Sequence, residues 1–175
     1  MKETISSIDI CSKLCKSKCC RSTPPALTKS DRERIKEKTK LKNWYISIEK
    51  NQKTAYVVKK KNNSNDCIFL TEDGLCEIYD HRPLDCRFFP LLVKIKKQNK
   101  DKYNIKWLVW YCPLTENKGT DILKNESKEF LESILEVDPN QIFEYQEAMY
   151  LSRGYKKKHF FNEECLKIQK SDSLS

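Results

Sequence analysis

Glycine is scarce in this chain of 175 residues, which contains only Gly74, Gly119 and Gly154. A phosphate-binding loop or a dinucleotide fingerprint needs several closely spaced glycines, so neither can be built from these three. The sequence also lacks HExxH and GxSxG motifs and any clustered set of His and Asp. These absences argue against nucleotide-driven, zincin and serine-hydrolase chemistry.

Long apolar runs are absent as well. No stretch approaches the ~18 apolar residues of a membrane span. The segment from Met1 to Ile10 is polar and has no apolar run of signal-peptide length. We therefore expect a soluble, cytoplasmic protein without a membrane partner, in which thiols stay reduced. Hydrophobic residues make up 38% and charged residues 34%, so a thin core would gain stability from a bound metal.

The chain is basic, with 34 Lys and Arg against 25 Asp and Glu, a formal charge of +9. A basic chain raises the possibility of nucleic-acid binding. The lysines are scattered, however, over residues 36–42, 59–61, 94–102 and 156–158. We interpret them as solvated surface, and a zinc-stabilised nucleic-acid-binding protein is the less favoured alternative.

Cysteine is plentiful, and eight of the nine cysteines form one ordered pattern. The spacing is C-x3-C-x3-C-C, then a gap of 46 residues, then C-x8-C-x9-C-x25-C. Soft thiolates select zinc and iron–sulfur iron, so the pattern predicts a metal or an iron–sulfur cluster. Disulfides are less favoured because the count is odd and no export signal is evident. The predicted ligands are Cys11, Cys15, Cys19, Cys20, Cys67, Cys76, Cys86 and Cys112.

The first four thiols set a geometric constraint. If residues 11–20 were helical, Cys11, Cys15 and Cys19 would lie on one face. Cys20 would point about 100° away from Cys19 in a helix, and to the opposite face in a strand. The two adjacent thiols therefore serve two sites, or one ligates and the other supports. Eight thiolates fit two zinc ions with four each, or a [4Fe–4S] cluster with spare thiols.

The remaining pattern predicts an α+β fold, in which β-hairpins and short helices make up a small cysteine-rich, metal-bound domain. Hairpins are expected at residues 44–58 and 91–110, a short strand at 67–70 and an Asp-Gly turn at Asp73-Gly74. Thr28 is expected to cap a helix from Lys29 to about Lys40, with Asp31 completing a capping box. Short helical turns are expected over residues 78–90, ending at Pro90.

A helical C-terminal segment is expected after Pro113. Leu123, Leu131 and Leu135 share one face of the first helix with Phe130 and Ile134. Asp138 and Pro139 begin a second helix, which we expect to bury Ile142, Phe143, Met149 and Tyr150 and to end at Gly154. The tail from Tyr155 is expected to hold one more helix, with Cys165 as a free cysteine. The predicted domains are 1–114 and 115–175.

Structural roles are expected for several residues near the cysteines. His81 is expected to be a hydrogen-bonded structural histidine rather than a ligand. Arg82 is expected to clamp the carboxylate of Asp80 or Asp85 rather than to bind an anion. A core position is expected for the aromatic residues near Cys112, which are Trp107, Trp110 and Tyr111.

Three runs of sequence carry a family resemblance. They are Cys67-Ile68-Phe69-Leu70, Gly74-Leu75-Cys76-Glu77-Ile78-Tyr79-Asp80-His81-Arg82-Pro83, and Cys86-Arg87-Phe88-Phe89-Pro90. Together with the Cys19-Cys20 pair, they resemble the YkgJ-like family, whose CxxCxxCC cysteine cluster is described as zinc- or iron-chelating. The resemblance covers about residues 11–114, and the C-x3-C-x3-C-C start departs from the family pattern. A similar cluster occurs in flagellin lysine N-methylases, which are larger, so their activity is not carried over.

The sequence therefore predicts a metal-binding protein whose eight cysteines hold zinc or an iron–sulfur cluster in a structural, redox or metal-handling role. The alternative is an iron–sulfur-dependent enzyme that transfers methyl groups or electrons. The sequence does not decide whether the protein is an enzyme, and it identifies no catalytic residue and no protein partner.

Overall fold

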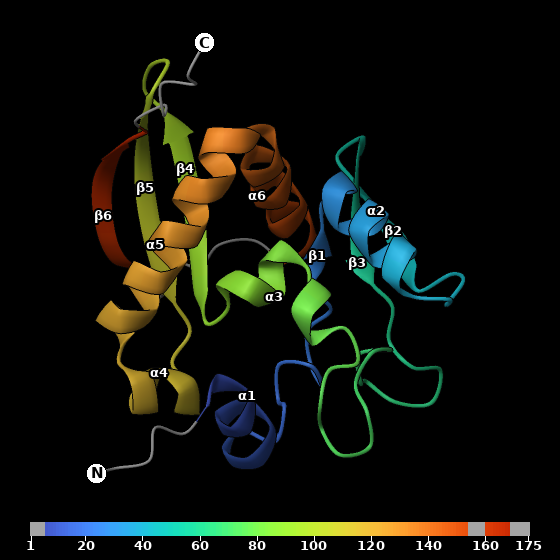
Figure 1. Ribbon diagram of the computed structural model, residues 1–175. Helices are drawn as coiled ribbons and strands as arrows, with labels where there is room; N and C mark the ends of the chain where they lie inside the picture. Colours follow the sequence, from blue (N-terminus) through green and yellow to red (C-terminus); the bar gives the residue numbers. More distant parts are fainter. Residues whose placement is uncertain (1–5, 154–159, 169–175) are drawn as a thin grey trace.

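The computed structural model describes residues 6–153 and 160–168, and it has two small antiparallel sheets with helices between and around them (Figure 1). One sheet has the order β1-β3-β2, with strands Ala26–Leu27, Lys53–Val58 and Tyr45–Lys50. The other has the order β4-β5-β6, with strands Leu91–Lys97, Lys102–Val109 and Phe160–Lys167. This mixed architecture confirms the predicted α+β class.

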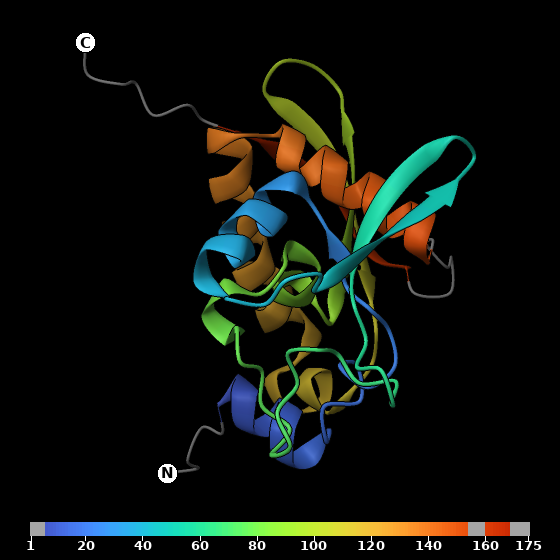
Figure 2. The same cartoon turned by 90° about the vertical axis from the view of Figure 1, so that its right-hand side faces the viewer.

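The long helices pack against the sheets. Helix α5, Thr120–Val137, covers the β4-β5-β6 sheet, and α6, Asn140–Ser152, lies between the two sheets and contacts both (Figures 1 and 2). Helix α5 buries Leu123, Leu131, Ile134 and Leu135, as its apolar spacing predicts. No helix among the described residues is long and apolar enough to cross a membrane.

Helix α2, Lys29–Lys38, begins at the predicted capping box. The Thr28 hydroxyl accepts from the Asp31 backbone N–H, and the Asp31 carboxylate accepts from the Thr28 N–H, both at 3.0 Å. Both predicted hairpins form, as β2-β3 and β4-β5. The predicted turns before Pro90 also form, as η2, Tyr79–His81, and α3, Leu84–Phe88.

Several predictions are wrong. Residues 67–70 do not form a strand; Cys67 and Leu70 make only isolated bridges, to Lys60 and Cys76. The expected helix in the tail is replaced over Phe160–Lys167 by β6, which pairs with β5 and carries Cys165. The predicted helix end at Gly154 and the stretch 155–159 lie outside the described residues.

The expected burial of three aromatic residues is also wrong. Tyr150 is 58% exposed, Trp110 44% and Tyr111 70%, whereas Trp107 is fully buried as predicted. Tyr150 lies on the outer side of α6, where Tyr145, Ala148 and Leu151 take the inner positions. The boundary proposed at residue 114 stays a prediction; one buried cluster contains Ile10 and Leu84 together with Leu131 and Met149.

Candidate metal centre

The first four cysteines lie on a short helical segment and the turns that follow it. Helix α1, Ser7–Asp9, continues into a π-helix, η1, Ile10–Leu14, which holds Cys11. The helix does not reach Cys19, because Lys16 and Ser17 adopt positive φ angles of 51° and 53°. π-Helical turns are frequent at functional sites, and here the turn places Cys15 directly after a widened helical loop.

The central cysteines are held on an irregular segment that is tied to the first. The Cys67 N–H donates to the carbonyl of Cys20 at 2.6 Å, and the Ser17 hydroxyl donates to the carbonyl of Gly74 at 2.6 Å. Gly74 has a φ of +77°, and a Cβ there would lie 3.4 Å from the Ser17 oxygen. Glycine therefore suits both the turn and the close approach of the two segments.

The last two cysteines come from regular elements. Cys86 lies within α3, and Cys112 is the residue before α4, Pro113–Lys118. The Cys112 sulfur accepts from the Thr115 backbone, while the Thr115 hydroxyl accepts from the Cys112 N–H at 2.9 Å. This reciprocal pair fixes the Cys112 side chain at the start of the helix. Helices α1 and α4 and the irregular chain between β3 and η2 lie at one end of the molecule, with α3 above them (Figure 1).

The first group of interacting thiols consists of Cys11, Cys15, Cys19 and Cys112. The pKa of Cys19 is raised to about 12, first by burial and then by electrostatic interactions with Cys15, Cys11 and Cys112. The pKa of Cys11 is also raised, by burial first and then by Cys15 and Cys112. Charges raise one another's pKa only when they are close, so these four sulfurs form one neighbourhood.

The second group consists of Cys20, Cys67, Cys76 and Cys86. Burial, with contributions from Cys19, Cys67, Cys76 and Cys11, raises the pKa of Cys20 to about 12. The pKa of Cys86 is raised well above its usual value by burial, then by Asp85 and by the other three thiols of the group. Cys20 thus interacts with Cys67 and Cys76 of its own group and also with Cys19 and Cys11 of the first, so the two groups adjoin at the Cys19–Cys20 pair.

Backbone N–H groups point at two of the sulfurs. The Phe69 N–H donates to Cys67, and the Ile78 N–H donates to Cys76, in each case from two residues further along the chain. Burial still raises the pKa of both thiols, to about 11 for Cys67, but each hydrogen bond opposes that rise because it favours the thiolate. Donors of this kind stabilise the form of sulfur that binds metals.

Arg82 lies close to both groups. It lowers the pKa of Cys11 in one group and of Cys76 in the other, although burial outweighs it in both cases. Its Nε donates to the Tyr79 carbonyl at 2.9 Å, and its guanidinium stacks 3.7 Å from the Tyr79 ring centre. The predicted clamp on Asp85 is wrong, because the partner of that buried carboxylate is Arg153.

The donor set suits a thiophilic metal. All eight predicted ligands are free cysteines, and sulfur donors favour zinc and iron–sulfur iron over hard cations. Over residues 6–153 and 160–168, no three Cys, His, Asp or Glu side chains meet closely enough to hold a metal ion as they stand. Cys165 is exposed on β6, where its sulfur lies 3.5 Å from the Gln98 side-chain oxygen.

Sequence reasoning missed how the eight thiols divide. The one signal for two sites was that the adjacent side chains of Cys19 and Cys20 must point in different directions. The partners of each thiol depend on contacts between segments that are distant in sequence, which spacing does not reveal.

A family model described as "CxxCxxCC: Putative zinc- or iron-chelating domain" matches residues 10–113. That span contains all eight thiols of the two groups and excludes Cys165. Comparisons with curated proteins and with solved structures each gave no match.

Proposed function

The chain belongs to this CxxCxxCC family of zinc- or iron-chelating domains, and from that premise we propose that it holds metal at two adjoining sites of four cysteines each. The first site would use Cys11, Cys15, Cys19 and Cys112. The second would use Cys20, Cys67, Cys76 and Cys86. Two observations support the proposal: the Cys67 N–H donates to the Cys20 carbonyl at 2.6 Å, which holds Cys20 beside the central cysteines, and Cys19 interacts with Cys15, Cys11 and Cys112.

Four thiolates satisfy either of two kinds of metal centre. Zinc is held tetrahedrally by four cysteines in structural sites, and a [4Fe–4S] cluster also takes four. Either choice leaves each site with a charge of about −2. Arg82, close to both groups, would offset part of that charge. Ligation would require the thiols to lose their protons and rotate toward a common point, because metals bind thiolates.

We propose a binding and folding role for the metal, in a reducing compartment such as the cytoplasm. The ligands come from three segments that are far apart in sequence, and two of those segments have little regular structure. Metal that joins them supplies folding free energy directly. Reduced cysteines are a requirement for this role, which is why an oxidising compartment would be incompatible with it.

Metal analysis of protein purified without oxygen tests the proposal. We expect a fixed ratio corresponding to two filled sites per chain, either colourless with zinc or absorbing near ~400 nm with iron and sulfide. Native protein that contains no metal and in which all nine cysteines react with an alkylating reagent would contradict the proposal.

A further inference from the structure

Helix α3, which carries Cys86, is too short to fix the position of that thiol by itself. It has five residues, Leu84–Phe88, and a helix of this length is not stable alone in water. Its N-cap is Pro83, which offers no side-chain acceptor to the first N–H groups of the helix. Contacts from other elements must therefore hold α3, and with it Cys86, in place.

One such contact comes from Asp31 on α2. Its Oδ1 accepts from the Leu84 N–H at 3.2 Å, across 53 residues of sequence, so Asp31 does the work of the missing N-cap. Its Oδ2 accepts from the Thr28 N–H at 3.0 Å. One fully buried carboxylate thus completes the capping box of α2 and also caps α3.

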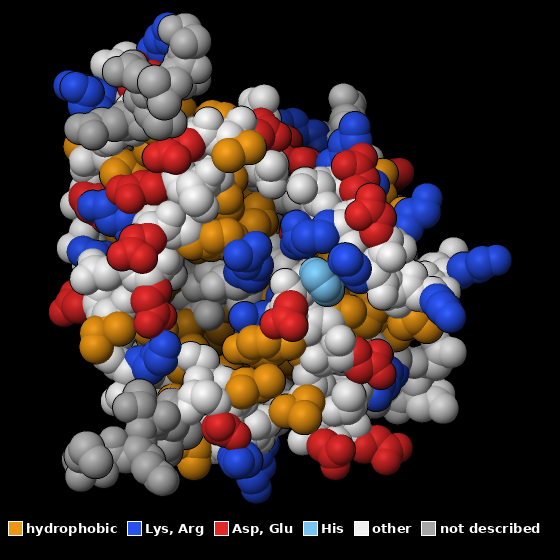
Figure 3. Space-filling model, in the orientation of Figure 1, with side chains coloured by type: hydrophobic (Ala, Val, Ile, Leu, Met, Phe, Trp, Pro, Cys, Tyr) orange, Lys and Arg blue, Asp and Glu red, His pale blue; other side chains and the backbone are white. Residues whose placement is uncertain are grey.

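Arg34 strengthens this link between the two helices. Its Nη2 donates to Asp31 Oδ1 at 2.7 Å and to the Arg82 carbonyl at 2.9 Å. The carbonyl before Pro83 and the N–H after it are therefore both held from α2. Lys and Arg side chains lie at the surface where α2 meets α3 (Figure 3), whereas the Asp31 carboxylate is buried. Charge-assisted hydrogen bonds that are shielded from water in this way are strong.

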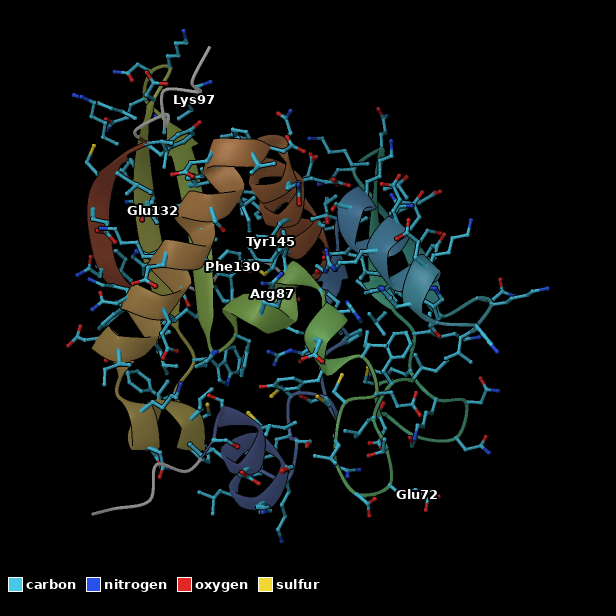
Figure 4. The ribbon with its side chains drawn as sticks, in the orientation of Figure 1. Glu72, Arg87, Lys97, Phe130, Glu132 and Tyr145 are labelled. Carbon is cyan, nitrogen blue, oxygen red and sulfur yellow. The ribbon has the colours of Figure 1, made fainter. Side chains whose placement is uncertain are left out.

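The other end of α3 is fixed by aromatic packing. The ring centre of Phe88 lies 5.1 Å from that of Phe130 on α5 and 5.5 Å from that of Tyr145 on α6. The guanidinium of Arg87 stacks 3.8 Å from the Phe130 ring centre (Figure 4). Cys86 lies between the capped end of α3 and this packed end, so the two sets of contacts together determine where its thiol points.

We propose that Asp31 is a positioning residue for the second metal site, which consists of Cys20, Cys67, Cys76 and Cys86. Asp31 does not bind the metal; it holds α3 so that the Cys86 thiol stays beside the other three. Cys67 and Cys76 lie on a segment with only isolated bridges, whereas the helix of Cys86 is anchored to α2, α5 and α6. Supporting contacts of this kind orient metal ligands. The inference rests on the proposed function, since it assumes that these four cysteines bind metal.

Zinc titration of the reduced, metal-free full chain, in competition with a chelator, tests this role in two backgrounds. Cys112→Ala should retain only the second site, and Cys67→Ala only the first. In the Cys112→Ala chain we expect Asp31→Asn to weaken zinc binding about 10- to 100-fold, as loss of a ligand-orienting contact does. In the Cys67→Ala chain the same substitution should leave zinc binding unchanged, because the first site does not use α3.

Thr28→Ala is the matched control. It removes the hydroxyl that accepts from the Asp31 N–H at 3.0 Å, which weakens the cap of α2 but keeps the contact of Asp31 with α3. Zinc binding should stay at the level of its background. Arg34→Lys keeps the charge and loses the fork, so it should weaken the second site less than Asp31→Asn does. The Asp31→Asn chain should still fold, because Asp85 on α3 keeps the hydrogen bond from the Ala26 N–H at 2.7 Å.

Three results would overturn the positioning role. The first is equal weakening of zinc binding by Asp31→Asn in both backgrounds, and the second is equal weakening by Thr28→Ala and Asp31→Asn; either would report general destabilisation. The third is unchanged zinc binding by Asp31→Asn in the Cys112→Ala chain. Failure of the proposed function has a different signature, because the wild type itself would then bind neither zinc nor iron with sulfide, and the inference would fall with it.

Discussion

The cysteine region and the sheet region of this molecule are stabilised differently. The cysteine region comprises residues 10–22 and 59–86 with Cys112. Its part around Cys67 and Cys76 packs against a cluster of only six buried apolar residues, whereas Cys11 and Cys112 pack against the other, larger cluster. The sheet region, β4 to β6 with α5 and α6, provides most of that larger cluster of 26. Between residues 59 and 78 the chain makes only isolated bridges, whereas β4, β5 and β6 pair over their lengths. We therefore expect the stability of the cysteine region to depend on bound metal and that of the sheet region not to depend on it.

Removing the metal should show the difference in stability between the two regions most clearly. We expect the cysteine region to lose several kcal/mol of stability, because ligand binding and folding are coupled there. Hydrogen exchange after chelation should show fast exchange over residues 10–22 and 59–86, with β4 and β5 still protected. Equal loss of protection in both regions would contradict the comparison.

Breaking the buried ion pair between Asp85 and Arg153 should have the next largest effect on stability. Arg153→Met leaves the carboxylate of Asp85 buried with only the Ala26 N–H donating to it, at 2.7 Å, and we expect a loss of about 3 kcal/mol.

The loss at this ion pair should also depend on pH. Burial raises the pKa of Asp85, and Arg153 opposes that rise, so the pKa should increase further in the variant. The folded variant would then take up a proton more readily than the unfolded chain. Its deficit should therefore shrink as the pH falls and be greatest above the raised pKa. Denaturant titration at several pH values measures this, and a deficit that grows in acid would contradict the assignment.

A cavity in the sheet region should destabilise the fold without affecting metal. Leu131 is fully buried in α5, and Leu131→Ala should cost about 3 kcal/mol. The bound metal should be unchanged, because the residue belongs to the large core and not to a thiol group. Val137→Ala on the same helix is the control, since Val137 is 84% exposed. Reduced metal content in folded Leu131→Ala would show that the regions are not independent.

The smallest effect is expected at the ninth cysteine. Cys165 is exposed on β6 and lies outside both thiol groups, so Cys165→Ala should leave metal content and melting temperature nearly unchanged. Elemental analysis of the purified variant checks this. If the variant loses as much metal as Cys67→Ala does, the division of the cysteines is wrong.

The regular elements could be predicted where local chemistry determines them. The capping box of Thr28 and Asp31 and the β-branched and aromatic runs of the two hairpins are signals within a few residues. Strand β6 was missed because its sequence is charged and does not alternate cleanly. It is held by contacts with β5: Lys106 pairs with Glu163 at 3.2 Å, and Trp107 donates to Glu164 at 2.8 Å.

Cysteine spacing predicts which residues make up the candidate site but not how they are arranged. The eight candidate ligands were chosen from that spacing alone. Their grouping depends on contacts such as Cys67 with Cys20, across a gap of 46 residues, and Ser17 with Gly74. The strand expected at residues 67–70 fails for a related reason. The Cys67 N–H donates to Cys20 and the Phe69 N–H to the Cys67 sulfur, so that neither amide is available for a strand ladder.

Native mass spectrometry of Cys112→Ala and Cys67→Ala, purified without oxygen, tests the central claim most directly. Cys112 belongs to the first thiol group and Cys67 to the second. The account predicts that each variant loses one of two metal centres and keeps the other, and that the double variant loses both. A wild-type protein with a single centre, or two variants that each lose all the metal, would contradict the division into two four-cysteine sites.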